Sequence, residues 1–143
     1  MASVDPRLIL YPAFAMFLLA AILLARLARL RFGAVGRGDL EGEFYRSFQG
    51  GEEPYEVRVT TRSFINQFEV PVLFYVGVIL TYVTEQVSYW LIACAWLYVA
   101  LRYVHCYVHL TSNDVLRRFR FYILSGFVLV VMWGSLFVGL VRG

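Results

Sequence analysis

The stretch Arg62-Ser63-Phe64-Ile65-Asn66-Gln67-Phe68-Glu69-Val70-Pro71 opens an apolar segment that runs to about Tyr82. In a helix, Arg62, Asn66 and Glu69 stand at i, i+4 and i+7, fall within an arc of roughly 60° and form one polar stripe. Residues 72–80 carry no charge, so the stripe lies at the entry of a transmembrane helix. A carboxylate costs roughly 2.5–3.5 kcal/mol at mid-bilayer, and less near the interface, which favours a functional role. The alternative is a stripe that pairs internally and only orients the helix.

The composition is that of a membrane protein, with 60% hydrophobic and 16% charged residues. A helix needs about 20 apolar residues to cross the hydrocarbon core, and the sequence has four such segments at 8–28, 63–83, 87–109 and 117–140. We therefore predict an all-α integral membrane four-helix bundle, forming a single domain over residues 1–143. A bundle of this size has little interior, so a sizeable site would need a partner subunit.

The links between these segments predict the orientation. Residues 33–61 are expected to form a surface loop, with a short amphipathic piece around 39–48 and an extended lead at 57–60. Pro71 is expected to kink the second helix beside the polar stripe. All thirteen basic residues are Arg and most lie in the first link and in 102–120, which places both links in the cytoplasm and both termini outside. We expect a bacterial inner-membrane protein, and the charge of +3 does not indicate a nucleic-acid partner.

A second polar cluster closes the third segment. Four of its residues share one helix face: Arg102, His105, Cys106 and His109. Tyr103 and Tyr107 share the adjacent face. The cluster suits an anionic ligand; alternatively, the two histidines at i, i+4 have metal-ligand spacing that Glu69 could complete, or the helix end is polar without a ligand. Cys94 and Cys106 are about 18 Å apart along the helix, too far to bridge, and are predicted to be small buried hydrophobes.

Arginines also flank the first and fourth segments. Arg26, Arg29 and Arg31 end the first, where they suit the helix dipole and the interface, or where one of them turns toward the site opened by Glu69. The fourth segment opens with three more: Arg117, Arg118 and Arg120. Guanidinium forks match carboxylates well, and the first and last of these three can face inward together.

With both clusters considered, the chain resembles the MAPEG superfamily, the membrane-associated proteins of eicosanoid and glutathione metabolism. Those proteins are four-helix membrane chains that assemble as trimers and bind glutathione between adjacent subunits. Their second helix carries Arg-x-x-x-Asn-x-x-Glu followed by a proline, the spacing of Arg62, Asn66 and Glu69. Their third helix ends in Arg-Tyr-x-x-x-Tyr or Arg-x-x-His, as 102–107 does. An Arg opening their fourth helix matches Arg117, with Arg118 close enough to be the counterpart.

The resemblance implies a glutathione transferase or peroxidase that takes glutathione as co-substrate and acts on lipophilic electrophiles or lipid hydroperoxides. It implies a homotrimer in contact with membrane lipid, and no metal. The implied ligand-binding residues are Arg62, Asn66, Glu69, Arg102, Tyr103, His105, Tyr107 and Arg117, and Arg29 or Arg31 would act as the catalytic cation near the thiol. Val70 stands where several active members carry Tyr, which favours the alternative of a non-catalytic binding or scaffold subunit. A metal or haem protein using His105 and His109 is a third hypothesis.

Overall fold

Four helical segments long and apolar enough to cross a membrane make up most of the chain: Pro6–Gly36, Tyr55–Val83, Tyr89–Leu110 and Val115–Arg142. The computed structural model describes residues 4–39, 43–48 and 51–142, and the regular structure in these ranges is entirely helical. The predicted all-α, four-helix membrane architecture is therefore confirmed. The first and fourth segments extend beyond both predicted ends, the second begins earlier than predicted, and the third is shifted to begin at Tyr89.

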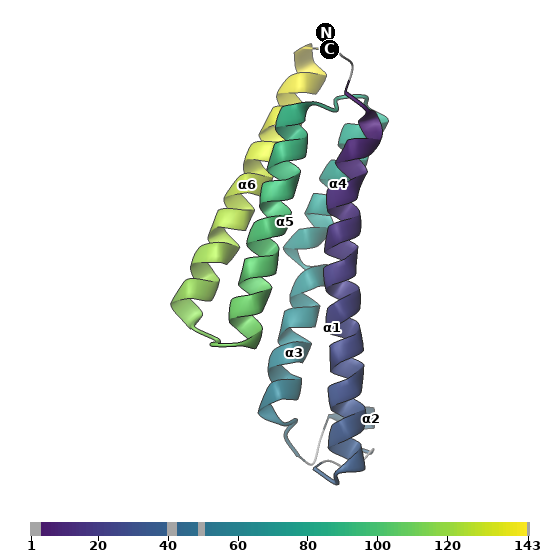
Figure 1. Ribbon diagram of the computed structural model, residues 1–143, viewed down its shortest axis with the longest axis vertical. Coiled ribbons are helices and arrows are strands. Elements are labelled where there is room, and N and C mark those ends of the chain that lie inside the picture. The colour runs from purple at the N-terminus through teal and green to yellow at the C-terminus, as the bar shows by residue number, and fades with distance from the viewer. Residues whose placement is uncertain (1–3, 40–42, 49–50, 143) are drawn as a thin grey trace.

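The first segment is η1 (Pro6–Ile9) followed by α1 (Leu10–Gly36), and the second is α3 (Tyr55–Ile65), η2 (Asn66–Phe68) and α4 (Val70–Val83). The last two are α5 (Tyr89–Leu110) and α6 (Val115–Arg142), and the short α2 (Phe44–Ser47) lies in the first link. Figure 1 shows η1 and the end of α6 at one end of the bundle and the α5–α6 turn toward the other. Helix α5 contacts α1, α3 and α6, so it forms the centre of the bundle.

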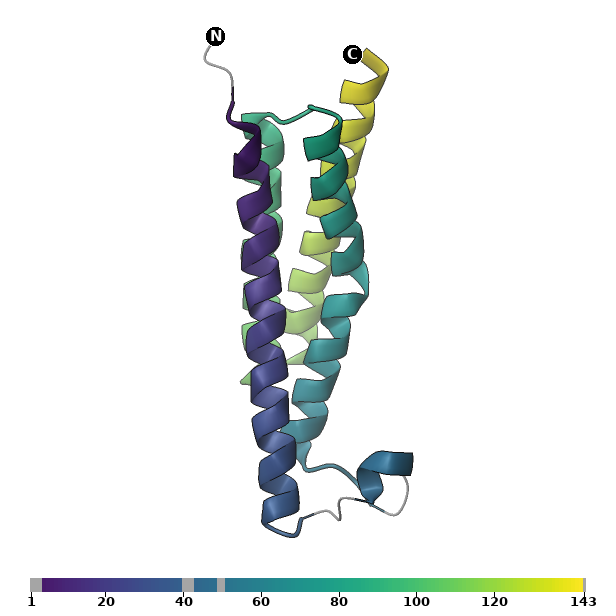
Figure 2. The same ribbon diagram turned by 90° about the vertical axis from the view of Figure 1, so that its right-hand side faces the viewer.

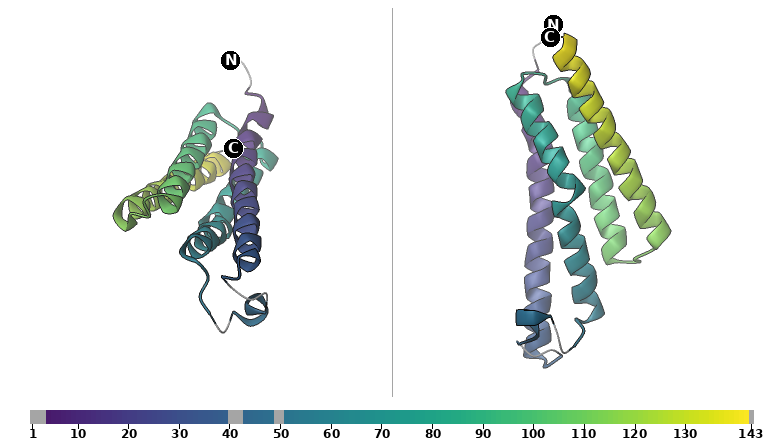
Figure 3. Two further views of the ribbon diagram at one scale, coloured as in Figure 1. Left: turned by 60° about the horizontal axis from the view of Figure 1, so that its bottom comes forward. Right: turned by 180° about the vertical axis from the view of Figure 1, so that it is seen from behind.

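Short, well-capped links make the neighbouring helices antiparallel. Ser88 begins α5, and its hydroxyl accepts a hydrogen bond from the Leu91 amide at 3.3 Å. The α5–α6 turn contains Asn113 at φ 48°, a left-handed conformation that Asn tolerates better than most residues. Seen from behind in Figure 3, α5 and α6 lie side by side along their length.

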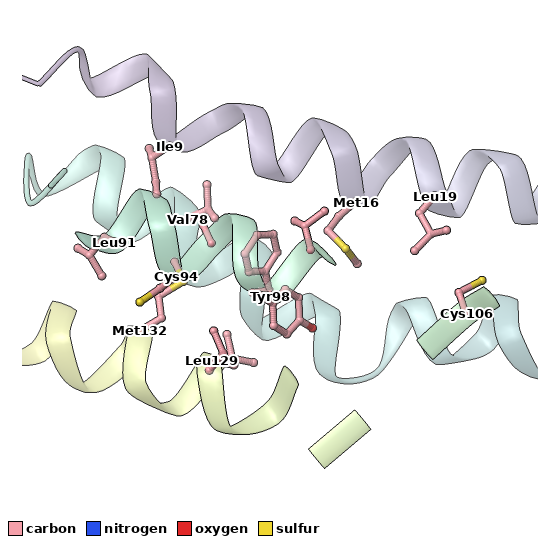
Figure 4. Packing of buried hydrophobic residues seen from close by; sticks show 14 of the residues in the cluster. Ile9, Met16, Leu19, Val78, Leu91, Cys94, Tyr98, Cys106, Leu129 and Met132 are labelled. Carbon is pink, nitrogen blue, oxygen red and sulfur yellow. The ribbon is translucent and has the colours of Figure 1, made fainter. Parts of the chain in front are cut away.

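The apolar core joins four of the helices in the half of the bundle that is nearer the termini. The ring of Tyr98 on α5 stacks on Phe74 of α4 with centroids 4.5 Å apart, and both are fully buried. Met132 of α6 and Cys94 of α5 pack into the same cluster, which Figure 4 shows between the ribbons. Cys94 and Cys106 are both buried and unbridged, as predicted.

The prediction of an extended lead at 57–60 is wrong, because these residues lie inside α3. Their β-branched side chains favour strands as an intrinsic preference, but tertiary packing overrides it. Val57 is buried against Leu27 and Ala34 of α1, and Phe64, two turns later on α3, packs on the same cluster. The first link is correspondingly shorter than predicted. The amphipathic piece expected at 39–48 is α2 at Phe44–Ser47, while residues 40–42 lie outside the described ranges.

Pro71 was expected to kink a continuous second helix, and the structure shows a full interruption instead. Helix α3 ends at Ile65, a 3-10 turn follows, and Glu69 leaves helical geometry with φ −95° and ψ −113°. Pro71 then sits in the first turn of α4. A proline is tolerated there because the first amides of a helix have no intrahelical acceptor. The interruption places the polar stripe at a helix end rather than on a helix face.

Candidate functional site

The interruption between α3 and α4 forms one wall of a cleft of about 360 Å³. Arg62, Asn66 and Glu69 all line it, so the three residues of the stripe lie together although the helix that related them is broken. The opposite walls come from α5 and from the first two turns of α6. They are formed by His105, His109, Val115, Arg118, Phe119 and Tyr122.

Asn66 connects the cleft to the buried Arg102. The Nη2 of Arg102 donates to both the side-chain Oδ1 and the main-chain oxygen of Asn66, the latter at 3.1 Å. The Nδ2 of Asn66 in turn donates to a carboxylate oxygen of Glu69 at 3.0 Å. Among the described ion pairs none joins Glu69 to an arginine, so Asn66 stands between the cation and the anion.

Arg102 does not line the cleft but contacts Asn66, which does. Its side chain is fully buried, and its guanidinium lies 5.9 Å from the centroid of the Tyr122 ring, within cation–π range. Arg102 also donates to the main-chain oxygen of Asn66 in the 3-10 turn, where the regular i to i+4 hydrogen bonding of α3 has ended. Arg102 therefore fixes the interruption and, through Asn66, the position of Glu69.

The two histidines of α5 form the floor of the cleft. Their rings meet edge to face at 5.9 Å, and His105 lies at 5.9 Å from the ring of Tyr122. Both are nearly completely buried, and the Nδ1 atom of each has no hydrogen-bond partner among the described residues. In the described part of the chain no three His, Cys, Asp or Glu residues come together as a metal site would require.

Of the arginines that open α6, the structure places Arg118 in the cleft. Arg118 donates from Nη1 to the side chain of Asn113 at 2.8 Å, which holds its guanidinium near the α5–α6 turn. Arg117 is exposed and faces Asp114 at 3.5 Å, outside the cleft. Successive helical residues differ by about 100° in direction, which is why only one of two neighbouring arginines can face the site.

The two tyrosines predicted as ligands do not line this cleft. Tyr103 donates its hydroxyl hydrogen to the main-chain oxygen of Ala15 on α1 at 2.8 Å, so it joins α5 to α1. Tyr107 is 69% exposed on the outer surface of the bundle. Sequence reasoning missed Tyr122, although it lies one helical turn after Arg118 and so on the same face.

The two arginines predicted to act near a thiol lie on α1, away from the cleft. Arg31 is engaged with Glu53 at 3.1 Å and with the Thr61 hydroxyl at 3.3 Å, and its guanidinium lies over the ring of Tyr45. Arg29 is exposed. Within one chain, therefore, the cations of the cleft are Arg62 and Arg118.

The cleft thus combines two guanidinium groups, one carboxylate, an amide and two imidazoles at the edge of a transmembrane bundle. A family model for the MAPEG family matches residues 9–138. No curated protein and no solved structure shows a significant match. Because the match spans nearly the whole chain, including most of each transmembrane segment and every residue of the cleft, the protein is a member of the MAPEG family.

Proposed function

We propose that the cleft binds glutathione and that the protein is a glutathione transferase or peroxidase acting on lipophilic electrophiles or lipid hydroperoxides. Membership of the MAPEG family associates the chain with eicosanoid and glutathione metabolism at membranes. The proposal adds the specific ligand and the reaction, and it depends on the charges in the cleft.

The observation that carries the proposal is the pairing of two guanidinium groups with one carboxylate in the same cleft. Glutathione carries two carboxylates and one ammonium, so its charges complement those of Arg62, Arg118 and Glu69. In this arrangement Glu69 would receive the ammonium group, because Asn66 already orients its carboxylate. The two arginines would bind the carboxylates, for which a guanidinium fork has the matching geometry.

Activation of the glutathione thiol needs a further cation near the sulfur. Lowering a thiol pKa from ~8.5 to ~6.5 takes about 2.7 kcal/mol. A cation at ~4 Å supplies roughly 4 kcal/mol at an effective dielectric of about 20. One arginine is therefore sufficient. Arg29 and Arg31 remain the proposed catalytic residues, and since neither faces the cleft of its own chain, they would act on that of a neighbouring copy.

A homotrimer in the inner membrane is the proposed assembly. Tyr107 and Arg117 do not line the cleft of their own chain, and both are exposed. Both would be available to a glutathione molecule shared with the next subunit. Native mass spectrometry from mild detergent tests this arrangement: three copies are expected, and a dominant monomer would remove the shared site.

Calorimetric titration of the detergent-solubilised protein with glutathione tests the ligand. Arg118→Gln should weaken binding about tenfold or more, because a charge-assisted pair contributes about 1.5–3 kcal/mol. Arg120→Gln is the matched control, since Arg120 is exposed two residues away on α6 and does not line the cleft. No heat at millimolar glutathione, or equal losses in the two variants, would contradict the proposal.

A second candidate function, non-catalytic binding, is favoured by the Arg31–Glu53 ion pair. Glu53 is only 9% exposed and neutralises one of the two proposed catalytic cations. A bound thiolate absorbs in the near ultraviolet, so difference spectra at pH 7 separate the two functions. A thiolate band on saturation with glutathione supports catalysis, whereas binding without the band supports a scaffold or binding subunit.

A further inference from the structure

A second cavity, of about 690 Å³, lies between the last turns of α1 and the short helix α2. Its walls are almost entirely apolar: Leu24, Leu27, Ala28, Phe32 and Val35 on α1, and Phe48 after α2. It shares no residue with the cleft described above. Its volume lies within the range of about 300–1,000 Å³ that is typical of small-molecule sites.

The lengths of the helices indicate that the cavity lies at the end of α1 that projects beyond the membrane-spanning part of the bundle. The segment that contains α1 has 31 residues and α5 has 22, and α5 alone is about 33 Å long, enough to cross the hydrocarbon core. The nine additional residues extend the first segment by about 13 Å. Figure 1 shows α1 projecting beyond the α5–α6 turn, and Figure 2 shows α2 folded beside that projecting end. If α5 spans the hydrocarbon core, the projecting end of α1 lies at the level of the lipid head groups.

Ion pairs within the described part of the chain surround the cavity. Three arginines on or next to its lining elements each pair with an acid at 2.8–3.1 Å: Arg31 with Glu53, Arg37 with Asp39 and Arg46 with Glu43. Among the residues that the structure describes, Arg31 is the only charged one that lines the cavity. A carboxylate placed there would have to compete with Glu53 for that cation. The cavity therefore favours an occupant whose head group is uncharged.

Tyr45 is the polar feature of the wall. Its ring lies under the Arg31 guanidinium at 5.2 Å, and its buried hydroxyl has no hydrogen-bond partner among the described residues. Burial and the neighbouring Glu53 carboxylate raise the pKa of this phenol, so it stays protonated and keeps a hydrogen to donate. A buried hydroxyl without a hydrogen-bond partner destabilises the fold. An acceptor oxygen at the head-group end of a lipid chain would accept a hydrogen bond from Tyr45.

We propose that this cavity binds the hydrocarbon chain of an uncharged single-chain lipid, of the monoacylglycerol or fatty-alcohol class, with its head-group oxygen at Tyr45. The tail would lie along Leu24, Phe32 and Val35, which are partly exposed at the membrane surface in the isolated chain. Within one chain the cavity and the cleft have separate linings, and the cavity touches the proposed glutathione reaction only through Arg31.

Photo-crosslinking of the full-length protein in detergent tests the proposal with monopalmitoylglycerol that carries a diazirine in its acyl chain. The label should map to residues 24–36 and 44–48 by mass spectrometry. Unlabelled monopalmitoylglycerol should compete at least tenfold better than palmitate, which differs by its charged head. Tyr45→Phe should weaken the glycerol lipid about fivefold to tenfold and leave a diazirine-bearing alkane unaffected, because only the hydrogen bond is lost.

Ala28→Phe fills the cavity and should reduce labelling at least tenfold, whereas Ala25→Phe is the matched control on the exposed side of the same helix. Equal effects of the two variants, or competition by palmitate as strong as that of the glycerol lipid, would overturn the proposal. A changed oligomeric state in Ala28→Phe without any specific label in the parent would assign the cavity to a contact between copies and overturn it too. The competition experiment needs no variant, so it decides even if Ala28→Phe does not fold.

Discussion

Replacing Asn66 by Ala should destabilise the folded bundle by about 2–4 kcal/mol, because one side chain pairs with a charge on each side of it. Its Oδ1 accepts from the buried Arg102, and its Nδ2 donates to Glu69 at 3.0 Å. Hydrogen bonds to charged groups contribute about 1.5–3 kcal/mol. The bond to Arg102 should contribute at the upper end of this range, because the guanidinium is buried and water cannot replace the lost acceptor. The bond to Glu69 should contribute little, because the exposed carboxylate can bind water instead. The main-chain bond at 3.1 Å remains and limits the loss.

Asn66→Asp is the matched control. It keeps an acceptor for Arg102 and turns that hydrogen bond into an ion pair, while it replaces the donor to Glu69 by a second carboxylate, from which the exposed Glu69 side chain can turn away. Its stability should stay within about 1 kcal/mol of the parent. Both variants can be measured by titrating denaturing detergent into mixed micelles and following helix content by circular dichroism. A stability of Asn66→Ala within 0.5 kcal/mol of the parent, or equal losses in the two variants, would refute the role assigned to Arg102.

Gly77→Ala should lower the melting temperature, at a cost of about 1–2 kcal/mol, because the new Cβ would lie 3.2 Å from Nε1 of Trp133, which donates to the Leu73 oxygen. Gly126→Ala, with nothing within 4 Å, should leave unfolding of the single chain unchanged, and similar losses in both would contradict this packing. Pro71→Ala should change stability by less than about 1 kcal/mol, because a proline in the first turn costs no hydrogen bond; a larger loss would show that the proline itself holds the interruption. A reporter active only in the cytoplasm, fused after the last residue, should be silent, and a strong signal would reverse the proposed orientation.

The transmembrane architecture could be read from the sequence because the bilayer leaves few options. A chain in lipid must satisfy its backbone hydrogen bonds internally, so each apolar run of about 20 residues becomes a helix. The ends of the helices were harder to predict, as residues 57–60 show. Val57 and Thr60 are β-branched and favour a strand by intrinsic preference, but both are buried in α3, which packs against α1. That contact is tertiary and leaves no local signal.

Cleft residues that follow one another along one segment could be predicted from their spacing. Cleft residues whose direction depends on how one helix packs against another could not. Helical spacing placed Arg62, Asn66 and Glu69 together, and all three do line the cleft. The choice between Arg117 and Arg118 depends on how α6 packs on α5, which the sequence does not specify. The apolar cavity beside the end of α1 could not be anticipated, since it forms only where Tyr45 and Phe48 face α1.

The interruption of the second segment, the buried cation and the cleft form one coupled structure. A guanidinium within a membrane bundle is costly unless acceptors surround it, and an unbroken helix would keep its main-chain oxygens in its own hydrogen bonds. At the interruption Arg102 donates to the main-chain oxygen of Asn66 and to the amide oxygen of the same residue. The amide nitrogen is then directed at Glu69 on the cleft wall. Arg102 therefore acts on any ligand of the cleft through Asn66, and its removal should disturb the orientation of Glu69 before it disturbs a direct contact.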